Sequence, residues 1–151
     1  MIYVLYGQPG SGKTTLSQLL CTHIQHQPEG NEAVIIDGDK FRKLFKQTDY
    51  STTGRENNIT AANTVATYIS QIQHVDVILA LVNPYAHLRA ELRVNNSQVT
   101  EILLESDRDL RRDYHVDDFE LGEPDHIINT DSSPDDTWSV LKGLLFKPRR
   151  W

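Results

Sequence analysis

The sequence predicts a single α/β domain over residues 1–151, built on a mostly parallel sheet of about five strands. Short β-rich or apolar stretches alternate with amphipathic helical stretches, which is the pattern of helices packed on both faces of a parallel sheet. The stretch 75–82 is almost continuously apolar, as is typical of a strand covered on both faces. A chain of 151 residues has the usual size of one domain.

The predicted elements begin with a strand at 2–6 and a glycine-rich loop, followed by a helix that places Leu16, Leu19, Leu20 and Ile24 on one face. The later strands are expected at 33–36, 75–82, 101–105 and 126–129. A helix is expected at 56–73, with Ile59, Ala62, Val65, Ala66, Ile69 and Ile72 at helical spacing, and a charged helical stretch at 108–113.

The last predicted helix has the clearest start signal. Ser133 is a candidate N-cap, Pro134 would occupy the first helical position, and two aspartates follow in the first turn. The apolar stripe of this helix is Trp138, Leu141, Leu144 and Leu145. Pro148 would end it.

The charge and composition exclude several classes of protein. There are 15 Lys and Arg against 21 Asp and Glu, a net charge of −6, which argues against broad attraction to nucleic acid or to an anionic membrane. No apolar run approaches the roughly 20 residues that span a bilayer. With one cysteine, Cys21, and no targeting segment after Met1, we expect a cytoplasmic protein that catches any anionic substrate in a local pocket.

The stretch GQPGSGKT matches the phosphate-binding loop pattern G-x-x-x-x-G-K-[ST], with the required strand before it and helix after it. Its glycines allow backbone N–H groups to turn toward phosphate oxygens at the positive end of a helix. Lys13 would reach the β- and γ-phosphates of ATP, and the Thr14 hydroxyl would bind Mg²⁺. The predicted ATP-binding residues are Gly7, Gln8, Pro9, Gly10, Ser11, Gly12, Lys13, Thr14 and Thr15.

A GTPase is excluded because its guanine-reading N-K-x-D motif is missing. The nearest stretch, INTD at 128–131, has no lysine. The loop therefore predicts an ATP-binding protein of the P-loop type, whether ATPase or kinase.

Asp37 and Asp39 follow the second predicted strand, where a loop can hold both carboxylates over the phosphate site. One of them could take a proton from an acceptor hydroxyl or order the water shell of Mg²⁺. The competing interpretation is structural, with Asp37 and Gly38 forming a turn and Asp39 capping a helix at 41–45. The neighbouring glycine loop favours the functional interpretation.

Arginines near the predicted strand ends suggest an oxyanion site. Arg42 lies one helical turn beyond Asp39, and Arg55 and Asn58 share the same three-residue spacing. Arg55 and Asn58 continue the apolar stripe of the helix at its first turn, so we expect both side chains to point into the cleft. A planar guanidinium can donate two hydrogen bonds to one phosphate or sulfate.

The order of these motifs resembles the adenylylsulfate kinase (APS kinase) family, and the likeness covers most of the chain. The family's phosphate loop and its aspartate-glycine-aspartate with a following arginine look like GQPGSGKT and DGDKFR. Its later aromatic, arginine and asparagine are similar to YSTTGRENN, its serine-proline-tyrosine turn to VNPYAHLR, and its segment before the last strand to VDDFELGEPDHIINTD.

The resemblance implies a three-layer P-loop kinase fold and transfer of the γ-phosphate of ATP to the 3′-hydroxyl of adenosine 5′-phosphosulfate, with ATP and Mg²⁺ bound. Lys13 and Asp39 would be the catalytic residues, Asp39 as base or metal organiser. Tyr50 would stack on the acceptor's adenine. The acceptor-binding set is Asp37, Asp39, Arg42, Tyr50, Arg55, Asn58, Asn83, Pro84 and Arg89.

The chain departs from this family in two places. Asn83 replaces the serine and Ala86 the first arginine of the serine-proline-tyrosine turn. The family's basic lid of roughly twenty residues is almost absent, since the charged stretch runs directly into the acidic segment, leaving Arg111, Arg112 and Tyr114 as lid candidates.

Three functions remain open from the sequence. The first is an APS-type kinase acting on a small, nucleotide-like acceptor; the second is a P-loop kinase for another nucleoside, nucleotide or polynucleotide 5′ end. The third is an ATP-binding module that has lost catalysis. A homodimer is possible, with the KPRRW end among its candidate contacts, and no membrane partner is expected.

Overall fold

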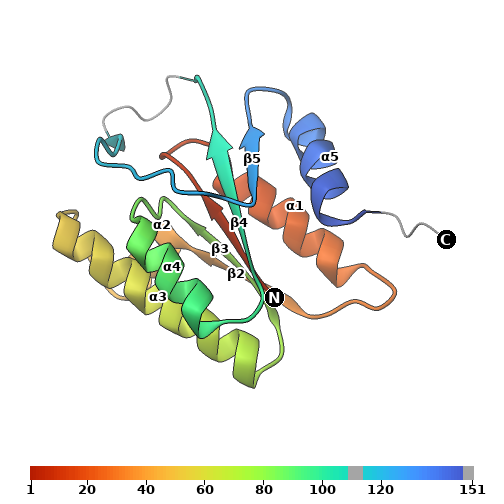
Figure 1. The fold of residues 1–151 in the computed structure, drawn as a ribbon, viewed down its shortest axis with the longest axis horizontal. Coiled ribbons are helices and arrows are strands. Elements are labelled where there is room, and N and C mark those ends of the chain that lie inside the picture. The colour runs from red at the N-terminus through yellow and green to blue at the C-terminus, as the bar shows by residue number, and fades with distance from the viewer. Residues whose placement is uncertain (109–113, 148–151) are drawn as a thin grey trace.

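The computed structural model describes residues 1–108 and 114–147, and these form a three-layer α/β fold (Figure 1). Five parallel strands make one sheet in the order β2-β3-β1-β4-β5. Their bounds are β1 Ile2–Tyr6, β2 Ala33–Asp37, β3 Asp76–Leu81, β4 Val99–Glu105 and β5 His126–Asn129. The helices are α1 Lys13–Gln25, α2 Gly38–Leu44, α3 Thr52–Ile72, α4 Ala86–Asn95 and α5 Pro134–Leu145.

The two faces of the sheet are covered by different helices, because alternate residues of each strand point in opposite directions. Ile2, Val4 and Tyr6 of β1 join the core under α3 and α4. Tyr3 and Leu5 join the core under α1 and α5. β1 is buried along its whole length, as expected of a central strand in a parallel sheet.

The predicted α/β class and the five strands are confirmed, and so are the N-cap and first turn of the last helix. The Ser133 side chain accepts a hydrogen bond from the Asp136 N–H at 3.1 Å, with Pro134 in the first turn. Of the predicted stripe, Leu141 is fully buried, but Leu144 is exposed at the helix surface. Ile72, at the end of α3, is exposed as well.

Two helices differ from expectation. α4 was not predicted, because the stretch after Pro84 was interpreted only as a turn. Its buried residues Leu88 and Leu92 lie one helical turn apart. α2 begins at Gly38 and is capped by Asp37, whose Oδ1 accepts hydrogen bonds from the N–H groups of Asp39 and Lys40. The competing structural interpretation, in which Asp39 caps a helix at 41–45, is therefore wrong about the capping residue and the helix start. Of the charged stretch at 108–113, Arg108 is not helical and the rest lies outside the described residues.

Within the described part of the chain, the model contains no helix that combines the length and the apolar character required to cross a membrane.

Candidate active site

A cavity of about 1220 Å³ lies at the carboxyl ends of β1, β2 and β3, where the crevice of an open α/β sheet is expected to bind ligands. Three consecutive strands contribute to it: the glycine loop after β1, the aspartates after β2 and the turn after β3. Of the predicted site residues, the cavity is lined by Pro9, Gly10, Gly12, Lys13, Thr14, Thr15, Asp37, Asp39, Arg42, Tyr50, Arg55, Asn58, Asn83, Pro84 and Tyr114.

The glycine loop has the backbone conformation that phosphate binding requires. Gly10 and Gly12 adopt positive φ values of 84° and 100°, which side-chain-bearing residues rarely adopt. Gly12 is also the N-cap of α1 and makes no side-chain cap, so the first N–H groups of this helix are not used by a capping side chain. A helix N-terminus of this kind attracts phosphate oxygens.

Lys13 lies across the loop. Its Nζ donates hydrogen bonds to the carbonyl oxygens of Gly7 at 3.1 Å and Gln8 at 2.9 Å, and to the Ser11 hydroxyl at 3.4 Å. These contacts place the ammonium group at the first turn of α1, inside the ring of loop residues. A cation here can neutralise charge on a phosphoryl group.

Thr14 and Asp37 form a polar pair on the cavity wall. The Thr14 hydroxyl donates to Asp37 Oδ2 at 2.9 Å, while Oδ1 of the same carboxylate caps α2. A hydroxyl beside a carboxylate suits Mg²⁺, which commonly takes one or two protein oxygens and keeps several waters. No group of three or more His, Cys, Asp or Glu side chains able to hold a metal occurs within the described ranges. The Thr14 and Asp37 oxygens are of the kind that Mg²⁺ prefers.

Asp39 is exposed in the first turn of α2 and faces the same cavity. The Asp37 carboxylate is hydrogen-bonded to Thr14 and to the start of α2, and both aspartates line the same cavity.

Arg42 stacks against Tyr50 at the cavity wall. Its Nη1 donates to the Asp49 carbonyl at 2.9 Å, and its guanidinium carbon lies 4.3 Å from the centre of the Tyr50 ring. Arg42 is buried while Tyr50 is 61% exposed, so the arginine stacks beneath an open aromatic surface.

Arg55 and Asn58 occupy the first two turns of α3 and line the cavity as their spacing predicts. Asn58 is buried. The Arg55 Nη1 lies 3.7 Å from Asp118 Oδ1, a partner that the sequence gave no reason to expect. The Arg55 side chain is 28% exposed and lies at the cavity wall.

Arg89 is the predicted acceptor residue that the structure does not bring to the cavity. It is 2% exposed and donates to the carbonyls of Asn83 at 2.6 Å and Glu120 at 2.5 Å. Its Nε lies 3.3 Å from Glu101 Oε1, and it covers the ring of Tyr6 at 4.3 Å. Burial raises the pKa of Tyr6, with Arg89 partly opposing that shift. Arg89 thus holds the turn that carries Asn83.

Three other predicted residues also lie behind the cavity wall. Gly7 and Ser11 are buried within the phosphate loop, and the Gln8 side chain points to Val116. The lid candidate Tyr114 lines the cavity and is 63% exposed. Arg111 and Arg112 lie outside the described residues.

Arg108 is a loop contact that the sequence reasoning missed. It donates to the Thr130 carbonyl at 2.7 Å and to the Gly10 carbonyl at 3.4 Å, beside the phosphate loop. Thr130 in turn donates to the Ser11 carbonyl at 2.6 Å. Arg108 follows β4 by three residues. The rule that ligands bind beyond the carboxyl ends of the strands, which pointed to Asp37, could therefore have identified Arg108 as well. Lys43 and Lys46, which line the cavity, were also missed.

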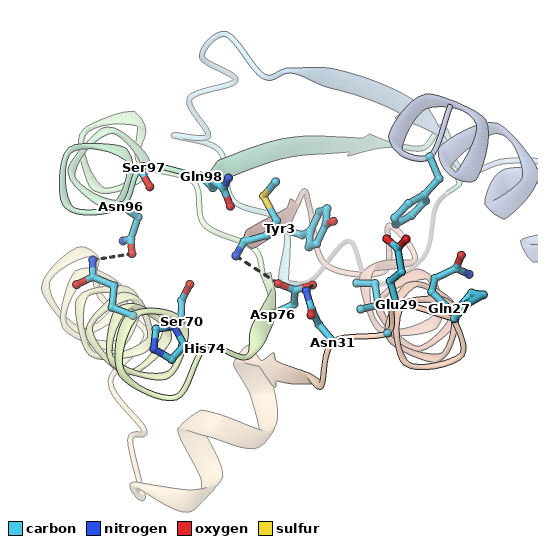
Figure 2. A pocket seen from close by; sticks show the side chains of 16 residues that line it. Tyr3, Gln27, Glu29, Asn31, Ser70, His74, Asp76, Asn96, Ser97 and Gln98 are labelled. Atoms are coloured by element: carbon cyan, nitrogen blue, oxygen red, sulfur yellow. Dashed lines mark hydrogen bonds and ion pairs between the residues drawn. The ribbon is translucent and has the colours of Figure 1, made fainter. Parts of the chain in front are cut away.

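A second cavity, of about 1030 Å³, opens at the other end of the sheet (Figure 2). Its centre holds Asp76, whose Oδ1 lies 3.3 Å from the Met1 amino group. Burial raises the pKa of Tyr3 to about 12, with Asp76 adding to the shift, so this side chain stays neutral. No lysine or arginine side chain lines this cavity among the residues that the structure describes.

We predict that Gly7→Ala destabilises the protein, because an added Cβ would lie 2.5 Å from the Leu104 carbonyl oxygen, a backbone atom that cannot rotate away. Overpacking of this kind costs about 1–3 kcal/mol. Urea unfolding measures the change. Gly143→Ala is the matched control: nothing lies within 4 Å of its added Cβ, and a helix-interior alanine should stabilise by up to about 1 kcal/mol. Equal stability of wild type and Gly7→Ala would contradict the packing argument.

The comparison with protein families follows this geometry. The model of the adenylylsulphate kinase family matches residues 1–116, which include the loop, both aspartates and the α3 residues. The chain belongs to the adenylylsulphate kinase family. The match ends at Val116, which lines the cavity.

Individual relatives of this adenylylsulphate kinase family member are distant. The adenylyl-sulfate kinase of Deinococcus deserti is 28% identical over 101 residues, which cover 66% of this chain and 54% of that protein. The match therefore spans about half the length of that relative.

Among solved structures, the APS kinase CysC of Mycobacterium tuberculosis in complex with AMPPNP and APS has a TM-score of 0.79 at 20% identity, covering 95% of this chain and 96% of that one. A cysteine-to-alanine mutant of the same enzyme has a TM-score of 0.73 at 23% identity, covering 95% of both chains. These likenesses confirm the P-loop kinase fold.

Proposed function

We propose that the protein is an ATP-dependent kinase that transfers the γ-phosphate of ATP to a hydroxyl group of a small anionic nucleotide, with adenosine 5′-phosphosulfate as the first candidate. The observation that carries this proposal is that one cavity is lined both by the phosphate loop and by the Asp39, Arg42, Tyr50 and Arg55 wall. An ATPase needs only the phosphate loop. The wall of Asp39, Arg42, Tyr50 and Arg55 would give a place for an acceptor opposite the donor.

Different groups of the chain would have different roles in this reaction. The glycine loop and the start of α1 hold the phosphates through backbone N–H groups, and Lys13 neutralises charge on the transferred group. Asp39 orients or deprotonates the acceptor hydroxyl, and Arg55 binds the acceptor's anionic group. Tyr50, stacked on Arg42, offers its exposed ring to the acceptor's base. Catalysis is then chiefly positioning and electrostatic stabilisation.

Thr14 and Asp37 would hold Mg²⁺ on the phosphate side. The metal supplies charge neutralisation of the phosphates when it is bound. The family relationship and the AMPPNP and APS bound by the distant M. tuberculosis relative support ATP as donor and a nucleotide as acceptor. We keep the cytoplasmic location as a prediction.

A kinase for a different acceptor is the second candidate. It is favoured by Arg89, an expected acceptor ligand that is fully buried outside the cavity, and by Tyr114, which is exposed where a longer lid would cover the site. A wider opening admits a larger nucleotide or a polynucleotide 5′ end. The net charge of −6 argues against long nucleic acids.

The test is an assay of ADP release with Mg-ATP and a panel of acceptors: adenosine 5′-phosphosulfate, nucleosides, nucleotides and 5′-hydroxyl oligonucleotides. We expect strong stimulation by adenosine 5′-phosphosulfate and identification of the 3′-phosphorylated product by mass spectrometry. Stimulation by another acceptor alone would replace the first candidate by the second. ATP binding with no stimulation by any acceptor would instead indicate an inactive binding module.

A further inference from the structure

The side chain of Gln8 joins the phosphate loop to the opposite wall of the cavity. Its Nε2 donates to the Val116 carbonyl at 2.8 Å, and its Oε1 accepts from the Val116 N–H at 2.9 Å. The two residues are 108 positions apart in the chain. One carboxamide therefore satisfies both backbone groups of a buried residue, with a geometry that fixes position and orientation.

The backbone of Gln8 is also hydrogen-bonded within the phosphate loop. Its backbone carbonyl accepts hydrogen bonds from Lys13 Nζ at 2.9 Å and from the Ser11 N–H at 3.1 Å. The same residue thus contacts the ammonium group of the donor site through its backbone and Val116 through its side chain. The Gln8 side chain does not line the cavity, so it is not placed to read a ligand.

Val116 belongs to a short stretch that faces the ligand space. Tyr114, His115 and Val116 all line the cavity. Figure 1 shows the chain returning from the end of β4 toward β5 through this stretch. Further along, the Tyr6 hydroxyl donates to the Leu121 carbonyl at 2.6 Å, and Arg89 donates to that of Glu120. These two anchors hold the distal part of the return segment, while Gln8 holds the part that faces the cavity.

We propose that Gln8 is a positioning residue: through Val116 it fixes the 114–116 wall of the acceptor site to the phosphate loop. The position of residues 114–116 then depends on the conformation of the phosphate loop, and acceptor affinity depends on the Gln8–Val116 link. This inference rests on the proposed function for its kinetic consequence, but its structural consequence does not. Because coupling free energies are reciprocal, whatever orders the loop also orders the wall.

The decisive variant is Gln8→Met, which keeps the length of the side chain and removes both hydrogen bonds. The matched control is Gln47→Met. Gln47 lines the same cavity and its Oε1 accepts from the Asp49 N–H at 2.9 Å, so the control removes a glutamine-to-backbone contact elsewhere on the wall. Hydrogen exchange of the Val116 amide is measured by NMR in wild type and in both variants.

We expect the Val116 amide to exchange at least about tenfold faster in Gln8→Met, with the β1 and β3 amides unchanged, because only the local protection is lost. Gln47→Met should leave Val116 unchanged. An unchanged Val116 exchange rate in Gln8→Met would overturn the inference. So would equal acceleration of all core amides, which would indicate a global loss of stability instead of a local positioning role.

The kinetic arm uses adenosine 5′-phosphosulfate and Mg-ATP. Gln8→Met should raise KM for the acceptor by roughly five- to thirty-fold, the effect of losing two hydrogen bonds, and by more than it raises KM for ATP. An unchanged acceptor KM would overturn the coupling to the acceptor site. If wild type does not turn over this acceptor, its proposed identity fails, and Val116 exchange still decides the role of Gln8.

Discussion

Replacement of Lys13 by methionine is expected to lower turnover by about 10²- to 10³-fold, the usual effect of removing one group that stabilises developing charge. Its ammonium group lies within the phosphate loop, bonded to the carbonyls of Gly7 and Gln8. The change removes the positive charge that the transferred phosphoryl group would meet. Steady-state ADP release, with nucleotide binding measured by calorimetry, gives the effect.

Lys43→Met is the control for the loss of a lysine from the same cavity. Lys43 is exposed on α2 and is not part of the phosphate loop. We expect its replacement to change turnover by less than tenfold, since a solvated charge at a distance is largely screened. Comparable losses in the two variants would contradict the specific role of Lys13 and point to a general effect of cavity charge.

Asp39→Asn should lower kcat by about 10²- to 10⁴-fold while nucleotide affinity stays near that of wild type. The amide has the shape of the carboxylate but cannot accept the proton of the acceptor hydroxyl. Asp39 is exposed in the first turn of α2, so the replacement should leave the fold intact. Single-turnover kinetics and ATP calorimetry separate chemistry from binding.

Asp37→Asn should give a different pattern, because Asp37 accepts from Thr14 on one oxygen and caps α2 on the other. We expect weaker binding of Mg-ATP together with a small loss of stability. If Asp39→Asn keeps full turnover and Asp37→Asn loses it, the catalytic assignment belongs to Asp37.

The local geometry of the phosphate loop could be predicted from the sequence for a physical reason. The phosphate loop is local: Gly10 and Gly12 at positive φ, Lys13 and Thr14 lie within a few residues, so spacing alone fixes their relation. The same holds for Arg55 and Asn58, one turn apart on α3, which line the cavity as expected. The start of α5 at Ser133 and Pro134 could equally be predicted from local capping rules.

The acceptor half was less predictable because its geometry depends on contacts between distant segments. Arg89 stands close to Asn83 and Pro84 in the chain, yet the helix α4 turns its guanidinium inward to Glu101 and Glu120. Arg55 meets Asp118 from the return segment. Neither partner is marked by a spacing, so the family resemblance that assigned Arg89 to the acceptor gave no sign that its side chain is used internally.

The sequence by itself determined the α/β class, the positions of the five strands along the chain and the phosphate-loop motif, since these follow from periodicity and short motifs. Only the tertiary structure decided which charged groups face the cavity and which are used internally. Gln8 shows the difference: within the loop motif it is an unspecified position, but folding brings it to Val116 and makes it a link between the two halves of the site.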